Sequence, residues 1–319
     1  MDRHTAEGLL GPRWPRMDVA STTSLREAGI SDRLLTEGVK SGAIIRLRRG
    51  AYIPAHRWSA LKPWEQDAAR IDGHIAGTGG SSVYCLASAA ILHGCSVWNA
   101  GSAVHVATGY SGARSSRGTD TLSHELGLSD TDVAKVERNG RLITVTTVVR
   151  TLVDCFRFLP HEQALVIGDS ALHHGLASAK VIRDAMMEAP DRGRRRALAV
   201  LHALEGRTES PGESRTRALL RRLGFADPVI QLELITAEGV YRADFAWVEL
   251  KIIIEFDGEG KYMDYEPTAS VLLAERRRET LLMEQGWTFV RLRWSDLEKP
   301  EEVRRRIESA LARAVRRSA

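Results

Sequence analysis

The sequence predicts an α+β protein of several domains, at residues 1–57, 58–200 and 201–319. A chain of 319 residues is long enough for two or three domains that each have a core. Short helical patterns precede a basic hairpin near the N-terminus, and helices and strands are mixed in the middle of the chain. The last region alternates apolar strands with helices, which predicts an α/β domain with a central mixed sheet.

The amino-acid composition limits the classes of protein to which this chain could belong. The hydrophobic fraction of 43% and the charged fraction of 27% are typical of a soluble globular chain. The net charge of +4 permits a nucleic-acid partner without requiring one. The three cysteines are too scattered for a disulfide framework or a paired-cysteine zinc site. No apolar run approaches the roughly 20 residues that span a bilayer, and the N-terminus lacks the apolar core of a signal peptide. We therefore expect a cytoplasmic protein without membrane contact, whose oligomeric state the sequence leaves open.

Residues 23–54 predict a winged helix. A short helix at Ser24–Ala28 leads through Gly29 into a second helix, which Ser31 caps and which has an apolar inner side. The following run, Ile44–Ile53, predicts two short strands around an Arg-Arg-Gly turn, which is the shape of a wing.

The wing carries three arginines, Arg46, Arg48 and Arg49. In a winged helix the second helix can enter the major groove while wing arginines neutralise phosphates, so these three are predicted DNA contacts. The alternative is that the winged helix packs against a protein partner or against another domain.

The sequence of the middle region predicts a mixture of helices and strands and shows no recognisable set of catalytic residues. Helices are expected at 86–94, 148–158 and 161–174, and strands at 103–107 and 142–146. Its histidines lack metal-ligand spacing, so we interpret them as structural or surface residues. The arginine-rich segment 189–210 is expected to be a hinge before the C-terminal domain.

The C-terminal domain predicts the order α-β-β-α-β-α. The helices are expected at 210–222, at 269–285 and at the terminus, and the strands at 241–247, 252–257 and 287–294.

Three acids lie on the first two of these strands. Side chains alternate along a strand, so Glu255 and Asp257 share one side, and a hairpin would bring Asp244 beside them. Carboxylates about 4 Å apart repel by roughly 4 kcal/mol at an effective dielectric constant near 20. A hard cation such as Mg²⁺, or Mn²⁺ in its place, would offset that repulsion, so the pattern predicts a metal site. The alternative is that the acids pair with arginines such as Arg242 or Arg291.

The C-terminal third resembles the PD-(D/E)xK restriction-endonuclease-like superfamily, and within it the bacterial domain similar to very-short-patch-repair mismatch endonucleases. The matching residues cover about 110 positions and come in a fixed order: Ser210-Pro211-x-Glu213-Ser214-Arg215, Arg242 to Trp247, Glu255 to Gly258, Lys261-Tyr262, Arg278-x-x-x-Leu282-x-x-x-Gly286-Trp287 and Val290-Arg291.

This resemblance implies Mg²⁺ ligands at Asp244 and Glu255, with the metal activating a water for phosphodiester hydrolysis. The superfamily's usual lysine two residues after the glutamate is replaced here by Asp257. Lys261 is the candidate that could reach in from the following loop instead.

The same resemblance implies Glu213 as a further site residue, and strand alternation indicates two arginines in addition. Glu213 is either a site residue on the first helix or the glutamate of a capping box with Ser210. Arg291 and Arg293 are expected on one face of the third strand, where they would meet phosphate or the acids.

The N-terminal two thirds resemble the AbiE-type abortive-infection antitoxins. The resemblance is carried by Ala28-Gly29-Ile30, by Gly42 to Tyr52, and in the middle region by Leu86 to Ala90 and Val148 to Asp154. In that family the winged helix binds operator DNA and represses its own operon, and the cognate toxin is a nucleotidyltransferase.

Two functions follow as hypotheses. The first is a DNA-binding protein with a Mg²⁺-dependent endonuclease domain, acting in phage defence or repair. The second is a non-catalytic repressor or antitoxin of a toxin–antitoxin system, whose nuclease domain is degenerate. Asp257 favours the second, and the retained Asp244 and Glu255 favour the first.

Overall fold

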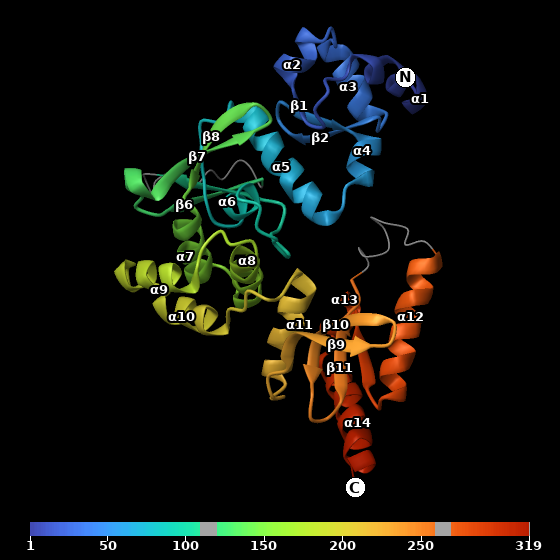
Figure 1. The fold of residues 1–319 in the computed structure, drawn as a ribbon. Coiled ribbons are helices and arrows are strands. Elements are labelled where there is room, and N and C mark those ends of the chain that lie inside the picture. The colour runs from blue at the N-terminus through green and yellow to red at the C-terminus, as the bar shows by residue number, and fades with distance from the viewer. Residues whose placement is uncertain (109–119, 259–268, 319) are drawn as a thin grey trace. The chain divides into compact units, whose positions relative to one another are not determined.

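The structure is a computed structural model that describes residues 1–108, 120–258 and 269–318. It is a mixed α+β protein in which the described strands form three sheets (Figure 1). The chain divides into two compact units. Unit 1 comprises Met1–Ile167 and Leu176–Leu201, and unit 2 comprises Gly168–Gly175 and His202–Ala319. Of the predicted domains, the first two therefore fall in unit 1, apart from the short segment that joins unit 2.

Unit 1 begins with the predicted winged helix. The structure adds a helix and a strand before Thr23, which the sequence pattern did not mark. The elements are α1 (Arg3–Leu10), the 3-10 turn η1 (Gly11–Arg13), β1 (Ala20–Ser21), α2 (Thr22–Glu27), α3 (Asp32–Lys40), β2 (Ile44–Arg48) and β3 (Ala51–Pro54). The three strands form a sheet in the order β1-β3-β2.

Local chemistry explains why α2 and α3 form a helix–turn–helix pair. The side chains of Ser21 and Ser31 cap the two helices. Between the helices the chain turns at Gly29, whose φ of 77° lies in the left-handed region that favours glycine. The core beneath them includes Leu25, Ile30 and other buried residues from α1, α3 and β2.

The rest of unit 1 is built on a five-stranded mixed sheet in the order β6-β5-β4-β8-β7. All the helices and strands predicted for the middle region are present within a residue or two. The elements are α4 (Ala55–Ala60), α5 (Pro63–Thr78), β4 (Val83–Tyr84), α6 (Leu86–Leu92), β5 (Val104–Thr108), β6 (Thr121–Glu125), the 3-10 turn η2 (Asp130–Asp132), β7 (Val133–Arg138), β8 (Arg141–Thr146), α7 (Val148–Phe158), α8 (His161–His173), α9 (Ala179–Glu188) and α10 (Arg194–Ala203).

The segment predicted as a hinge contains a helix, α10. The prediction was wrong there because the arginine run hides an apolar side: Ala197, Val200 and Leu201 are buried. The boundary between the two units nevertheless falls inside the segment, after Leu201.

Unit 2 contains a four-stranded sheet in the order β12-β11-β10-β9. Strand β10 runs antiparallel to both β9 and β11, and β12 runs parallel to β11. The elements are α11 (Pro211–Arg222), β9 (Val229–Thr236), β10 (Gly239–Trp247), β11 (Ile252–Phe256), α12 (Ala269–Glu284), β12 (Thr288–Leu292), α13 (Trp294–Leu297) and α14 (Pro300–Ser318).

Two features of unit 2 correct the predicted order. Strand β9 was missed, so the order is α-β-β-β-α-β-α with the short α13 before the last helix. The third predicted strand is also shorter than expected, because it ends at Leu292 and Trp294 already begins α13. Arg293 is the N-cap of α13, so only Arg291 of the two predicted arginines lies on the strand.

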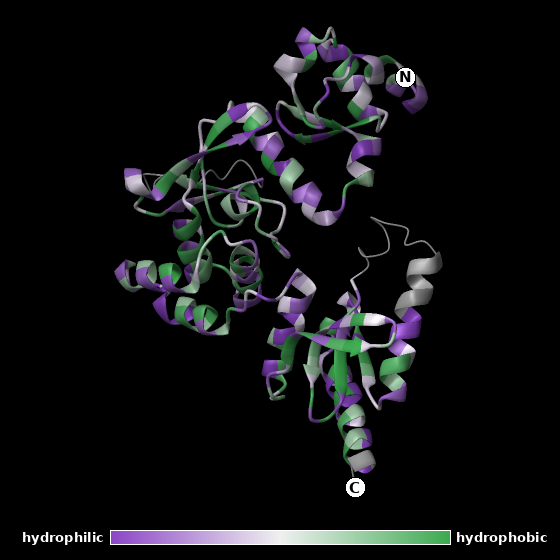
Figure 2. Cartoon of the chain, in the orientation of Figure 1, coloured by the Kyte–Doolittle hydropathy of each residue, from purple (hydrophilic) through white to green (hydrophobic). Residues whose placement is uncertain are grey.

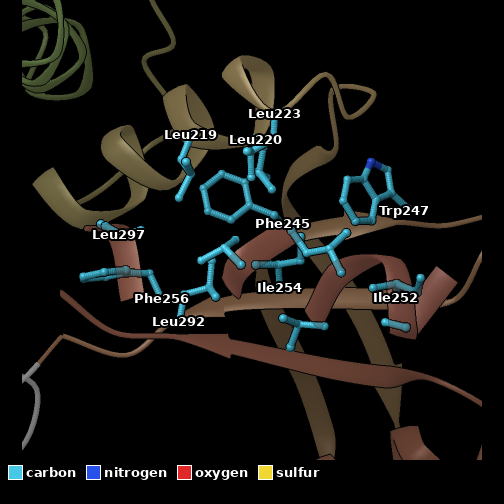
Figure 3. Close-up of a cluster of buried hydrophobic side chains, with 14 of the residues drawn as sticks. Leu219, Leu220, Leu223, Phe245, Trp247, Ile252, Ile254, Phe256, Leu292 and Leu297 are labelled. Atoms are coloured by element: carbon cyan, nitrogen blue, oxygen red, sulfur yellow. The ribbon is translucent and has the colours of Figure 1, made fainter. Parts of the chain in front are cut away.

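The two faces of this sheet bury separate clusters. One cluster joins α11 and α14 to the strands through residues such as Leu219, Phe245 and Ile254 (Figure 3). The other includes Leu282 of α12 and Ile253 of β11. Figure 2 shows the same layering, with hydrophobic strands in the middle of unit 2. The sheet is thus covered by helices on both faces.

No helix among the described residues is both long and apolar enough to span a lipid bilayer.

Candidate functional site

A groove runs between α3 and the β2–β3 wing in unit 1. Its volume is about 460 Å³, and its walls include Lys40 of α3 and two wing arginines, Arg46 and Arg49. Arg26 also lines it, but its charge is neutralised. The Arg26 guanidinium donates to both carboxylate oxygens of Asp32, at 2.9 and 2.6 Å. This pair joins α2 to the start of α3 and holds the pKa of Asp32 below its ordinary value.

The outer side of α3 is presented to solvent. Arg33, Thr36 and Lys40 are exposed and follow the spacing i, i+3 and i+7, so they share one side of the helix. The sequence pattern could have identified them, because they are the polar complement of the apolar inner side that predicted the helix. In this region, only the wing arginines were predicted as DNA contacts from the sequence.

The three wing arginines do not share one environment. A β-bulge lies between Arg46 and Arg48, and such a bulge re-aims the side chains that follow it. Arg48 is half-buried, and its Nε lies 3.4 Å from a carboxylate oxygen of Asp120. Arg46 and Arg49 are exposed and line the groove. The groove therefore receives two of the three predicted arginines.

In unit 2, Glu213 lies in the first turn of α11 and is only 4% exposed. Its carboxylate accepts hydrogen bonds from the Ser210 hydroxyl at 2.7 Å, from the Glu209 backbone N–H at 2.9 Å and from the Gln231 side-chain amide at 2.9 Å. The predicted cap is thus present, although Glu213 reaches back to the amide of Glu209 and not to that of Ser210. The contact with Gln231 ties α11 to β9, which a capping role alone does not require.

Asp244 of β10 is also buried, at 6% exposure. Its carboxylate accepts the backbone N–H of Phe256 on β11 at 2.8 Å. Burial, and secondarily the charge of Asp244, raises the pKa of Glu213, so the two carboxylates interact electrostatically. The register that pairs Phe245 with Ile254 places Asp244 level with Glu255.

Glu255 has a partner that its sequence context does not indicate. Burial raises the pKa of the Tyr241 hydroxyl, and the charge of the Glu255 carboxylate and a hydrogen bond to it raise that pKa further. Asp257 follows the end of β11, and its backbone N–H donates to the Leu292 carbonyl at 2.7 Å. The two arginines proposed as alternative partners of the acids form ion pairs elsewhere. Arg242 pairs with Glu209 and Arg291 with Glu279, each at 2.6 Å.

A complete metal centre is not formed by these side chains alone. Across residues 1–108, 120–258 and 269–318, no three histidine, cysteine, aspartate or glutamate side chains are grouped so that they could hold a metal ion. Lys261, the predicted substitute for the strand lysine, lies outside the described residues. The assignments of Asp244, Glu255, Asp257 and Lys261 therefore stay predictions.

One region of the chain matches a known protein family. Residues 16–55 match the family described as "Transcriptional regulator, AbiEi antitoxin". The matched residues run from before β1 to the end of the wing, so they contain α3 and the groove. The resemblance predicted for the winged helix is confirmed over these residues. Its predicted continuation into the middle region, and the endonuclease resemblance of unit 2, stay predictions. No curated protein matches the chain.

Proposed function

We propose that this protein is a DNA-binding transcriptional regulator of the antitoxin type. The observation that carries the proposal is the basic groove between α3 and the wing, within the residues that match the regulator family. The family implies two partners, operator DNA and a cognate toxin protein. On this proposal the chain binds DNA upstream of its own coding sequence.

The geometry of the groove indicates different roles for α3 and for the wing. An α-helix fits the major groove of B-DNA, where base edges can be distinguished, so the exposed side of α3 is the reading surface. Arg46 and Arg49 extend from the wing and would neutralise phosphates, which positions the helix without reading sequence. Arg48 would contribute through its contact with Asp120, which holds the wing strand in place.

The test is equilibrium binding of the full-length protein to a duplex from upstream of its own coding sequence. The variant Arg46→Ala/Arg49→Ala should bind this duplex and a scrambled duplex more weakly by similar factors. For each lost phosphate contact, the slope of log K against log salt should become shallower by about 0.9. The matched control is Arg183→Ala/Arg195→Ala, which removes two exposed arginines from α9 and α10. Equal slopes in the wing variant and the wild type would refute DNA contact by the wing.

A second candidate function is Mg²⁺- or Mn²⁺-dependent cleavage of DNA by unit 2. The observation that favours it is the proximity of three acids: the buried Glu213 on α11, the buried Asp244 on β10 and, level with Asp244, the half-buried Glu255 on β11. Purely structural acids would gain nothing from this proximity. Any further metal ligand would have to come from outside the described residues or from the DNA itself.

Cleavage is tested with supercoiled plasmid and either metal ion. Glu255→Gln is the matched variant because it removes the charge and keeps the size of the side chain. Lys261→Ala should slow cleavage by about a hundredfold if that lysine stabilises the transition state. Intact plasmid after incubation with the wild-type protein would leave the regulator as the whole function.

A further inference from the structure

Unit 2 carries a second basic groove, at the edge of its sheet. The groove has a volume of about 340 Å³, and four arginines line it: Arg291 of β12 and Arg305, Arg306 and Arg313 of α14. We propose that this groove binds the phosphate backbone of DNA. The proposal rests on the regulator function above and adds a second contact surface on the same DNA.

Packing fixes the side of α14 that faces the groove. Val303, Ile307, Ala310 and Ala314 are buried in the core of unit 2 and hold the helix against the sheet. Arg306, Ser309 and Arg313 follow the spacing i, i+3 and i+7. They therefore lie together along one flank of the helix, next to its buried side. Arg306 and Arg313 are thus held on one flank of the helix, and Arg305 lines the same groove.

The charges in the groove are only partly compensated. Arg291 pairs with Glu279 at 2.6 Å, and Arg306 pairs with Asp296 at 3.1 Å. The ion pairs found among the described residues include none for Arg305 or Arg313, and Arg313 donates instead to the Ser309 hydroxyl at 2.9 Å. Guanidinium groups gathered in this way repel each other, and a phosphate oxygen would offset that repulsion with strong charge-assisted hydrogen bonds.

The position of the groove also discriminates between partners. Strand β12 is an edge strand, and an open edge can recruit an extended peptide as an additional strand. Here Arg306 already donates to the backbone carbonyl of Arg291, so part of the edge is occupied. A blocked, cationic edge suits an anion better than a peptide strand. The regulator match in the same chain makes DNA the source of that anion that we favour.

The experiment compares four full-length proteins: the wild type, the wing variant Arg46→Ala/Arg49→Ala, the groove variant Arg305→Ala/Arg313→Ala and the combination. Binding to a 30-base-pair duplex of random sequence is followed across a salt series. The groove variant should flatten the slope of log K against log salt by about 1.8, which corresponds to two phosphate contacts, whether or not the wing is intact. Arg183→Ala/Arg195→Ala controls for the loss of two positive charges. Arg305→Lys/Arg313→Lys keeps the charges and should retain most of the slope.

Each outcome decides between the claims. A flatter slope for the wing variant alone would overturn the second surface and leave the regulator function standing. A flatter slope for the groove variant alone would support the groove and contradict DNA contact by the wing. Lack of duplex binding by the wild type at low salt would overturn both. Binding of inorganic phosphate that the groove variant loses, together with unchanged duplex affinity, would identify a small-anion site and overturn the assignment to DNA.

Discussion

The environment of the Arg48 side chain could not be predicted from the neighbouring residues in the sequence. Arg48 stands in a run of basic residues and was predicted to contact DNA with Arg46 and Arg49. A β-bulge lies before it, and its side chain lies against Asp120, where it is only 20% exposed. A bulge depends on how two strands pair, and no local residue pattern marks it here. The run predicted the wing correctly, but it could not predict which arginines the wing displays.

Gly212 shows a residue whose role is steric. It lies in the first turn of α11, and a Cβ atom at this position would overlap the Phe256 ring. Gly212→Ala should therefore lower the free energy of unfolding of unit 2 by about 1–3 kcal/mol, the usual cost of overpacking. Chemical denaturation followed by circular dichroism measures this. Gly8→Ala is the matched control, because nothing lies within 4 Å of its added methyl group and helix propensity should make it neutral or stabilising. Equal stability of Gly212→Ala and the wild type would contradict the packing described for α11.

His105 predicts a pH dependence of stability. It is buried on β5, and its Nδ1 lies 3.0 Å from Nε2 of His124. Burial, and then the neighbouring His124, lowers the pKa of His105 from 6.5 to about 4. Between these values the unfolded chain binds the proton more readily than the folded chain does. The stabilising effect of the neutral ring is thus complete above about pH 6.5 and is lost as the pH falls towards 4.

The size of this effect follows from the shift. One pKa unit corresponds to about 1.4 kcal/mol, so His105 should account for roughly 2–3 kcal/mol of lost stability between these pH values. The variant His105→Asn should lose correspondingly less stability than the wild type over the same range, as measured by urea denaturation at several pH values. His74, whose pKa burial also lowers to about 4, shifts the curves of both proteins alike. Parallel curves for the two proteins would show that the His105 pKa is not depressed.

At the scale of elements, the sequence predicted best the elements whose ends carry local signals. Helix α11 was predicted within one residue because Ser210, Pro211 and Gly224 mark both its ends. Strand β9 was missed, although Ile230, Leu232 and Leu234 alternate with polar residues in part of it. Its outward residues include the hydrophobic Ile235, which is 83% exposed, so the alternation is incomplete. An apolar residue on the solvent side weakens the period of two that identifies a half-buried strand.

Helix α3 should determine sequence preference. Arg33 is exposed on its outer side, within reach of base edges if the helix enters the major groove. Arg33→Ala should lower the affinity for the upstream duplex relative to a scrambled duplex by about 1–3 kcal/mol, the value of one good contact to a base. Competition binding at fixed salt gives this ratio directly. A uniform loss on both duplexes would instead place Arg33 on a phosphate, and no loss would move α3 away from the DNA.

At the scale of the whole molecule, the sequence predicted three domains, whereas the structure divides the chain into two compact units. The winged helix was predictable because caps, glycine turns and an arginine-rich hairpin are local signals. The candidate site of unit 2 was less predictable from the sequence. Strand alternation and an expected hairpin indicated Glu255 and Asp244, but the contact of Glu213 with Gln231 depends on how α11 packs on β9, and that of Glu255 with Tyr241 on how β10 pairs with β11. Pairing partners are distant in sequence, so no residue pattern specified them.

The central claim is that α3 and the wing bind DNA. Hydrogen exchange of the full-length protein, measured by mass spectrometry with and without the upstream duplex, tests it most directly. Peptides that cover α3 and the β2–β3 wing should exchange more slowly when the duplex is present, and Arg46→Ala/Arg49→Ala should lose this protection at the same duplex concentration. Unchanged exchange over residues 32–54 in a protein that is saturated with the duplex would contradict the account.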